Sequence, residues 1–350
     1  MWRGVIREYW DFLPVKKEES IVTLLEGNTP LIPSARIQKE RLPGIALFFK
    51  YEGLNPTGSF KDRGMTVAVS MAKEMGSKAI ICASTGNTSA SAAAYAAKAR
   101  MKAFVLIPEG KIALGKLSQA IAHGAQVIQI EGNFDEALRI VREISDTEPI
   151  TLVNSLNPYR IEGQKTASFE VIDHLGSVPT YHCLPVGNAG NITAYWKGYQ
   201  EYWEKGRVEG LPKMLGFQAE GAAPIVRGKM IERPETLATA IRIGNPASWK
   251  QAEAARDQSG GLIDMVSDDE ILEAYRMMAN LEGIFCEPAS AASLAGVMKL
   301  GQKGFFKKGD VLVLTITGHG LKDPDIAIRI SQKPVSIPPK KDAVLEYLDL

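Results

Sequence analysis

The sequence predicts an α/β protein in which mainly parallel sheets are covered by helices. Short apolar runs alternate along the chain with segments in which apolar residues recur at helical spacing, which is typical of parallel sheets with packed helices. Several of the helical segments also end at a glycine, as helices commonly do. We expect two domains with twisted sheets, a large one formed by residues 1–56 and 156–350 and a small one formed by residues 57–155.

The apolar runs predict the strands in chain order. Between residues 79 and 318 they read AIICAS, KAFVLIP, AQVIQIEG, PITLVNS, TYHCLPVG, MLGFQAEG and DVLVLTITG. Between residues 66 and 206, helices are predicted in TVAVSMAKEMG, SASAAAYAAKAR, FDEALRIVREI and ITAYWKGYQEYWEKG. Because ligands bind beyond the carboxyl ends of parallel strands, the loops after these strands are the places to look for chemistry.

The bulk composition excludes several classes of protein. The 350 residues include 41 Lys and Arg against 40 Asp and Glu, so no overall field attracts nucleic acid or an anionic membrane. No stretch reaches the roughly 18 uninterrupted apolar residues of a membrane helix. The cysteines, Cys82, Cys183 and Cys286, lie far apart in or beside apolar runs, which favours a reducing compartment and no metal site. We expect a cytoplasmic protein that binds neither nucleic acid nor membrane.

The segment NPTGSFKDRG, residues 55–64, places Lys61 at a predicted junction between a loop and a helix. The positive end of a helix dipole lowers the pKa of a nearby lysine, which favours the neutral amine that forms Schiff bases. The alternative is a solvated surface charge at a helix start.

Three further loops follow predicted strands. The loop after AIICAS offers hydroxyls, an amide and free N–H groups at a helix start, which suit an anion; the alternative is an ordinary helix cap. Glycines in the loop GNAGN let the backbone approach a phosphate, and a hydroxyl ends the strand VLVLTIT. The residues concerned are Ser84, Thr85, Gly86, Asn87, Thr88, Gly187, Asn188, Ala189, Gly190, Asn191 and Thr317.

One common cofactor uses all of these features together. Pyridoxal phosphate offers an aldehyde to a lysine, a phosphate to a glycine turn and a pyridine nitrogen to a group at a strand end. A nicotinamide dehydrogenase is disfavoured, because the glycine fingerprint of dinucleotide-binding domains is absent.

The chain also resembles the fold-type II pyridoxal-phosphate enzymes, and among them the threonine synthases. The matching stretches, in the family order between residues 26 and 323, are EGNTPL, NPTGSFKDRG, STGNTSAS, PVGNAGN, EPASAA and TGHGLKD. Threonine and serine dehydratases look similar around SFK, but their phosphate loop is typically nearly all glycine and their strand-end residue is usually Ser or Cys. The loop GNAGN and Thr317 are similar to those of threonine synthases.

The resemblance implies a role for each matching residue. Lys61 would bind the cofactor as a Schiff base and shuttle protons, Asn87 would hydrogen-bond its ring hydroxyl, and Thr317 would face its pyridine nitrogen. Residues 187–191 would hold its phosphate. The implied reaction converts O-phosphohomoserine and water to threonine and phosphate, the last step of threonine biosynthesis, in a homodimer whose large domain binds the cofactor and whose small domain binds the substrate.

The resemblance also implies contacts with the substrate. Ser84, Thr85, Gly86 and Thr88 would bind its carboxylate. The substrate phosphate needs a second anion site, for which VNSLNPYRIEGQK offers Asn154, Ser155 and Arg160. A guanidinium binds two phosphate oxygens at once, which favours Arg160; the alternative is a surface arginine.

Other features leave alternatives open. Glu287, which precedes Pro288, is expected to cap the following helix. His319 either orients the cofactor or stabilises its own turn. The tail from residue 331 is either a docking arm or a loosely packed terminus. The alternative functions are a threonine or serine dehydratase on the same fold and a pyridoxal-phosphate-binding protein without catalysis.

Overall fold

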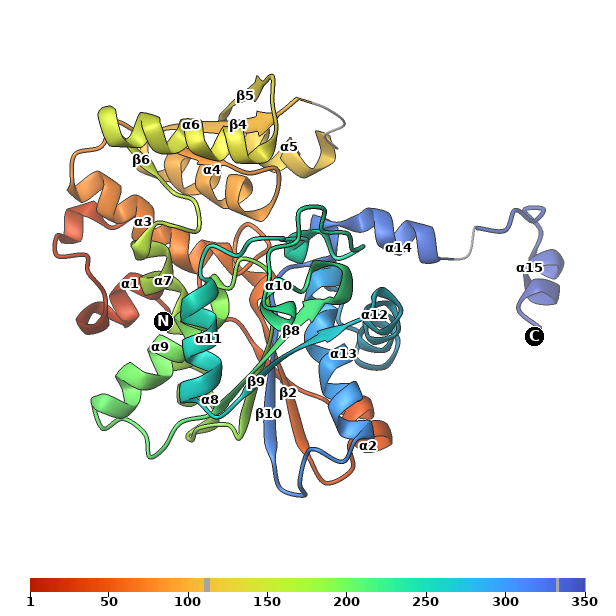
Figure 1. Cartoon of the computed structure of the whole chain (residues 1–350). Helices are drawn as coiled ribbons and strands as arrows, with labels where there is room; N and C mark the ends of the chain where they lie inside the picture. Colours follow the sequence, from red (N-terminus) through yellow and green to blue (C-terminus); the bar gives the residue numbers. More distant parts are fainter. Residues whose placement is uncertain (110–113, 332–333, 350) are drawn as a thin grey trace.

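The chain forms two sheets, seen in a computed structural model that describes residues 1–109, 114–331 and 334–349 (Figure 1). In these residues one sheet has six strands in the order β1-β2-β10-β7-β8-β9, and the other has four in the order β5-β4-β3-β6. The larger sheet comprises β1 (Leu31–Pro33), β2 (Ala46–Tyr51), β7 (Tyr181–Pro185), β8 (Lys213–Ala219), β9 (Leu262–Val266) and β10 (Val311–Ile316). The smaller sheet comprises β3 (Ala79–Ala83), β4 (Lys102–Pro108), β5 (Gln126–Ile130) and β6 (Ile150–Leu152).

The strands are parallel except at one edge. β10 lies between β2 and β7 and is parallel to both, with Leu314 opposite Phe49 and Cys183. β1 pairs with β2 in the antiparallel direction. All three pairings within the smaller sheet are parallel. The carboxyl ends of the parallel strands within each sheet therefore lie along one edge of that sheet, where ligands bind in open α/β sheets.

The α-helices alternate with the strands along most of the chain. In the first half they are α1 (Val5–Glu8), α2 (Arg36–Arg41), α3 (Lys61–Glu74), α4 (Asn87–Ala99), α5 (Leu114–Ala122), α6 (Phe134–Thr147), α7 (Pro158–Gln164) and α8 (Thr166–Leu175). In the second half they are α9 (Gly190–Glu204), α10 (Pro224–Arg227), α11 (Trp249–Gln258), α12 (Asp268–Glu282), α13 (Pro288–Gln302), α14 (Pro324–Ile330) and α15 (Lys341–Tyr347).

Each face of the larger sheet packs in a different hydrophobic cluster. Cys183 and Leu215 belong to the cluster that includes residues of α12 and α13. Their neighbours in sequence, Leu184 and Met214, belong to the cluster that includes residues of α8, α9 and α11. Figure 1 shows α12 and α13 on one side of this sheet and α9 and α11 on the other. Because successive strand residues point to opposite faces, a strand buried on both faces is apolar throughout.

The α/β fold class is confirmed. The seven predicted apolar runs form β3, β4, β5, β6, β7, β8 and β10, and the four predicted helical segments lie in α3, α4, α6 and α9. β1, β2 and β9 were not predicted. β1 has only three residues, and β9 is an edge strand whose first four residues are only partly buried, so neither gives a long apolar run.

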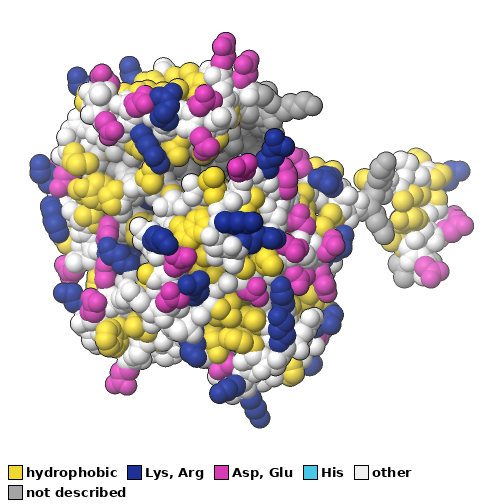
Figure 2. All heavy atoms as spheres, in the orientation of Figure 1, with side chains coloured by type: hydrophobic (Ala, Val, Ile, Leu, Met, Phe, Trp, Pro, Cys, Tyr) yellow, Lys and Arg dark blue, Asp and Glu magenta, His cyan; other side chains and the backbone are white. Residues whose placement is uncertain are grey.

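The C-terminal segment extends away from the rest of the chain. In Figure 1, α15 lies apart from the body of the molecule beyond α14, and Figure 2 shows apolar side chains on its surface. Val344 and Tyr347 of this helix are exposed. In the described residues, no helix combines the length and apolar character needed to span a membrane.

Candidate functional site

A cavity of about 410 Å³ is lined by loops that follow strands of both sheets. The loops after β3 and β6 come from the smaller sheet, and those after β7 and β10 come from the larger one. The cavity brings together every residue predicted for the site: Lys61, Ser84, Thr85, Gly86, Asn87, Thr88, Asn154, Ser155, Arg160, Gly187, Asn188, Ala189, Gly190, Asn191 and Thr317.

Lys61 is the first residue of α3, and backbone hydrogen bonds hold it beside the end of β10. The Phe60 N–H donates to the Thr317 carbonyl at 2.9 Å, and the His319 N–H donates to the Gly58 carbonyl at 2.9 Å. Gly58 has a φ of +85°, in the left-handed region that favours glycine. These bonds explain how the junction before α3 and the last strand of the sheet share one site.

The Lys61 amine is available for chemistry. Its Nζ makes no hydrogen bond or ion pair within the described chain, and it lies 4.2 Å from the centre of the Phe60 ring. The pKa of Lys61 is lowered to about 7, mainly by burial and to a smaller extent by the nearby Arg160, with Glu287 acting in the opposite direction. The sequence predicted a lowered pKa from the helix dipole, whereas burial is the largest cause here. Near neutral pH a large fraction of this amine is therefore unprotonated.

The loop of residues 84–88 leads from β3 into α4. Gly86 is the N-cap residue of α4, and no side chain caps this helix, so the ordinary Ser/Thr cap is wrong. The Ser84 hydroxyl instead accepts a bond from the Gly86 N–H at 3.2 Å. The start of α4 thus faces the cavity with hydroxyls and N–H groups, an arrangement that suits an anion.

The turn of residues 187–191 leads from β7 into α9 and has an unusual backbone. Ala189, the N-cap of α9, has a φ of +64°, which costs free energy for a residue other than glycine. The Ser248 N–H fixes the turn by donating to the Asn188 carbonyl at 3.1 Å. Within the part of the chain that the structure describes, no acceptor pairs with the backbone N–H groups of residues 187–191. Free N–H groups at a helix start suit a phosphate, and this turn of residues 187–191 is called the phosphate cup below.

Arg160 is buried beside the cavity, so the alternative of a surface arginine is wrong. Its side chain is 1% exposed, its Nη1 donates to the Val153 carbonyl at 2.8 Å, and its buried Nε has no partner among the described residues. α7 reaches this position because it packs closely on α3: a Cβ on Gly163 would collide with the Arg63 backbone. Burial lowers the pKa of Arg160 to about 10, which leaves it positively charged at neutral pH.

Asn154 and Ser155 line the same side of the cavity after β6. The Asn154 amide already bonds to Ala83 in both directions, since Oδ1 accepts from the Ala83 N–H and Nδ2 donates to its carbonyl, each at 2.9 Å. Asn154 therefore joins β6 to β3 and has one amide hydrogen left for a ligand.

Glu287 lines the cavity and does not cap α13, whereas the sequence had led us to expect a cap. It is the N-cap residue of α13, but its side chain caps nothing; it is 3% exposed and lies across the cavity wall. Its Oε2 accepts from the Asn87 Nδ2 at 2.9 Å, and its Oε1 accepts from the Thr317 hydroxyl at 2.9 Å. Only the position before Pro288 was visible in the sequence, and that position indicated a cap. The contacts join residues 200 and 30 positions away, which no local pattern reveals.

His319 stabilises its own turn, the second of its two predicted roles. Its Nδ1 accepts from the Leu321 N–H at 3.2 Å, and its ring stacks on that of Tyr51. A residue of the same motif was missed: Lys322 lines the cavity and donates to the Thr57 carbonyl at 3.2 Å and to Gln119 Oε1 at 2.6 Å. Its place in the TGHGLKD motif was the available signal.

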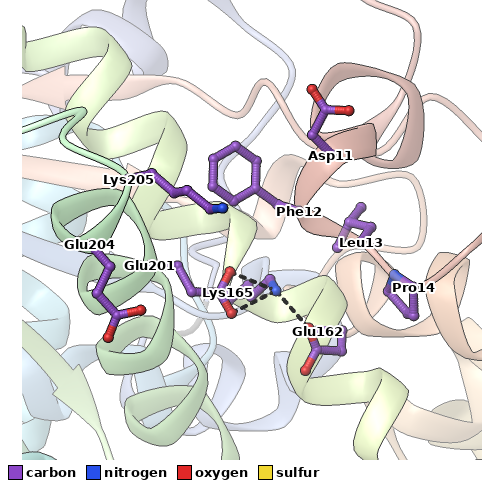
Figure 3. Close-up of a pocket in the computed structure, with 9 residues that line it drawn as sticks. All are labelled: Asp11, Phe12, Leu13, Pro14, Glu162, Lys165, Glu201, Glu204 and Lys205. Atoms are coloured by element: carbon purple, nitrogen blue, oxygen red, sulfur yellow. Dashed lines mark hydrogen bonds and ion pairs between the residues drawn. The ribbon is translucent and has the colours of Figure 1, made fainter.

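A second hollow, of about 370 Å³, shares no lining residue with the first (Figure 3). Figure 3 shows the Lys165 side chain pointing between Glu162 and Glu201, and its Nζ lies 2.6 Å and 2.7 Å from their carboxylate oxygens. The paired charges make this a structural ion cluster, and none of the predicted site residues lies there.

Comparison with known proteins agrees with the chemistry of the first cavity. Residues 22–318 match the family described as "Pyridoxal-phosphate dependent enzyme". The chain belongs to this family. A threonine synthase of Halalkalibacterium halodurans is 60% identical over 99% of this chain and 98% of its own. One from Bacillus sp. is 63% identical over 95% of this chain and 94% of its own. The structure of maize serine racemase superposes with a TM-score of 0.75 at 20% identity, covering 94% of this chain and 97% of its own, which shows the shared fold.

The cavity fits the cofactor of the pyridoxal-phosphate-dependent enzymes. Lys61 supplies an unpaired amine for an aldehyde, and the turn of residues 187–191 supplies unpaired N–H groups for a phosphate. Asn87 and Thr317 supply further polar side chains on the cavity wall. In the described residues, no three His, Cys, Asp or Glu side chains group as metal ligands.

Proposed function

We propose that this chain is a threonine synthase, which converts O-phosphohomoserine and water to threonine and inorganic phosphate with pyridoxal phosphate. The observation that carries the proposal is the convergence of an unpaired lysine, a phosphate cup and a separate buried arginine in one cavity. The cofactor has one phosphate and the substrate has another, so a reaction between them needs two anion sites. The high identity to relatives named threonine synthase supports the same conclusion.

The chain's own residues would hold the cofactor as follows. Lys61 would bind the aldehyde carbon, the N–H groups of residues 187–191 would bind the phosphate, Asn87 would bond to the ring hydroxyl, and Thr317 would face the ring nitrogen. When bound, pyridoxal phosphate supplies an electron-withdrawing ring that stabilises negative charge developing on the substrate carbons. The left-handed conformation of Ala189 shapes the turn of residues 187–191. The hydrogen bonds donated by the Phe60 and His319 N–H groups hold the segment before Lys61 beside Thr317.

Lys61 would also move protons to and from the substrate. Its amine, with a pKa of about 7, is a base matched to neutral pH. It would take the substrate Cα proton and then a Cβ proton; with phosphate leaving from Cγ, Cγ would regain a proton, water would add its hydroxyl at Cβ, and Cα would regain a proton to give threonine. Because the lysine serves both carbons in turn, it must reach each without being held by another side chain, which its lack of partners permits.

Two regions bind the ends of the substrate. Ser84, Thr85, Gly86 and Thr88 offer hydroxyls and N–H groups to its carboxylate at the start of α4. Arg160, with Ser155 and the remaining amide hydrogen of Asn154, binds its phosphate. Arg160 lines the cavity and stays positively charged at neutral pH, so its guanidinium suits a phosphate.

The experiment that tests the proposal compares products. Purified protein loaded with pyridoxal phosphate is incubated with O-phosphohomoserine, and phosphate and threonine are measured; in parallel, keto acid is measured with threonine or serine. We expect equal amounts of phosphate and threonine, and no phosphate from the Lys61→Ala variant. Keto acid without phosphate would indicate a dehydratase, and neither product would indicate a binding protein.

We also propose that the protein is a homodimer in the cytoplasm. Its resemblance to the threonine synthases supports the dimer, and three free buried cysteines suit a reducing compartment. Light scattering during size-exclusion chromatography measures the mass directly: twice 38.1 kDa is expected, and a monomer at micromolar concentration would contradict the dimer.

A further inference from the structure

The hydroxyl of Thr317 has a fixed hydrogen-bonding direction. Its Oγ1 lies 2.9 Å from Glu287 Oε1 and 2.8 Å from the Ser290 Oγ. Ser290 is fully buried, and its Oγ accepts from the Gly318 N–H at 3.2 Å. A hydroxyl has one proton to donate. If Thr317 donated to Ser290, the Ser290 proton would have no acceptor among the described residues, which is costly for a buried group.

The remaining arrangement runs in one direction, from Ser290 to Thr317 to Glu287. Asn87 donates to the second carboxylate oxygen, so both oxygens of Glu287 accept bonds from neutral donors. Burial raises the pKa of Glu287, whereas the bonds from Asn87 and Thr317 and the charges of Lys322 and Lys61 oppose this rise. With Asn87 donating to one oxygen and Thr317 donating to the other, neither oxygen of Glu287 needs a proton to bond to its partner, which is the hydrogen-bonding pattern of an ionised carboxylate.

This direction limits what Thr317 can offer to a ligand. Its proton goes to Glu287 and one lone pair accepts from Ser290, so only the other lone pair faces a further group. A ligand nitrogen placed there can bond to Thr317 only by donating a hydrogen. An unprotonated pyridine nitrogen has no hydrogen to donate, so its lone pair would face the lone pair of the Thr317 oxygen and the two would repel.

We propose that Glu287, acting through the Thr317 hydroxyl, keeps the ring nitrogen of bound pyridoxal phosphate protonated. The inference rests on the cofactor placement proposed above. A hydroxyl facing the ring nitrogen does not by itself require a proton there; the buried carboxylate behind it does. The competing arrangement moves one proton from the ring nitrogen to Glu287 and reverses the bond, so that Thr317 donates to the ring. Glu287 is thus a positioning residue that sets the electron-withdrawing strength of the ring.

The substitution Glu287→Gln separates the two arrangements. Because Asn87 Nδ2 can only donate, it favours the orientation in which the oxygen of the new amide faces Asn87. The amide nitrogen then faces Thr317. Thr317 then accepts from both Gln and Ser290, and its proton is free for the ring nitrogen. The matched control is Ser290→Ala, which removes a neighbour of Thr317 but keeps the bond from Thr317 to Glu287.

The test is ¹⁵N magnetic resonance of holoenzyme loaded with pyridoxal phosphate labelled at the ring nitrogen. We expect the shielded resonance of a pyridinium in the wild type and in Ser290→Ala, and the deshielded resonance of a neutral pyridine in Glu287→Gln. A pyridine resonance in the wild type, which needs no variant to fold, would overturn the inference, as would a pyridinium resonance in a folded Glu287→Gln protein. A wild-type holoenzyme that makes threonine with an unprotonated ring overturns this inference alone. Failure to bind the cofactor overturns it together with the proposed function.

Discussion

Lys61 and Arg63 lie two positions apart in α3 and carry the same type of charge, but their surroundings differ completely. The Lys61 amine lines the cavity, 4.2 Å from the centre of the Phe60 ring, and makes no hydrogen bond or ion pair among the described residues. The Arg63 guanidinium is fully buried and bonds to Glu52 at 2.6 Å and 2.8 Å and to Glu170 at 2.6 Å and 2.7 Å. Lys50 completes this cluster by donating to Glu170 at 2.6 Å.

The comparison shows how one helix serves two needs. The buried cluster pairs two cations with two carboxylates and ties α3 to β2 and α8. Asp62, which lies between Lys61 and Arg63 in the sequence, accepts hydrogen bonds from Thr57 and Ser91 and closes the turn before the helix. Because the side chains of Asp62 and Arg63 anchor the start of α3, Lys61 is held in position without a hydrogen bond to its own amine. The sequence suggested only a polar helix start at Asp62 and Arg63, and their complete burial was not predicted.

The largest expected effect comes from removing the unpaired charge. Lys61→Ala should reduce threonine formation to background, because no other group replaces the amine as anchor and base. The melting temperature should stay at or above that of the wild type, since a partly buried amine without a hydrogen bond or ion pair is lost. Lys73→Ala, at an exposed lysine near the end of the same helix, is the matched control and should keep full activity. Near-normal turnover in Lys61→Ala would refute the proposed function.

The next effect comes from breaking the paired cluster. Glu170→Gln leaves Lys50 and Arg63 with an uncompensated buried charge, so the free energy of unfolding should fall by about 3–5 kcal/mol in urea titrations. Glu143→Gln, which breaks an exposed pair with Arg139, should change it by less than about 0.5 kcal/mol. Equal losses in the two variants would show that the buried cluster does not hold α3.

Arg160 tests whether the second anion site belongs to the substrate. Arg160→Ala should raise KM for O-phosphohomoserine by roughly 10- to 150-fold, equivalent to the ~1.5–3 kcal/mol of a bond to a charged group. The affinity for pyridoxal phosphate, measured by fluorescence, should not change. Arg139→Ala on the exposed face of α6 is the control. A normal KM in the Arg160 variant would remove this residue from the substrate site.

The smallest effect concerns pH. Because burial lowers the pKa of Lys61 to about 7, the neutral amine predominates above that pH. The rate at which apoenzyme captures pyridoxal phosphate, followed by stopped-flow absorbance, should rise about tenfold per unit below pH 7 and level off above it. A rate that keeps rising to about pH 10, as for an ordinary lysine, would show that the amine is not perturbed.

The sequence predicted much of this site because local signals and chemistry coincided. Loops that follow apolar strands and carry Gly, Ser, Thr or Asn could be assigned individually, and parallel pairing brings such loops to one edge of a sheet. Glu287 and Arg63 could not be assigned in this way. Arg63 meets Glu170 across 107 positions and Glu287 meets Asn87 across 200, so their roles depend on packing that no short pattern encodes.

The most direct test of the central claim asks which lysine carries the cofactor. Lys61 and Lys322 both line the cavity, and burial lowers the pKa of each. Lys322 already donates to Thr57 and Gln119, whereas Lys61 has no such partner in the described chain. Holoenzyme is reduced with borohydride, digested and analysed by mass spectrometry. The account predicts the pyridoxyl mass on Lys61; the same mass on Lys322, or on no lysine, would contradict it.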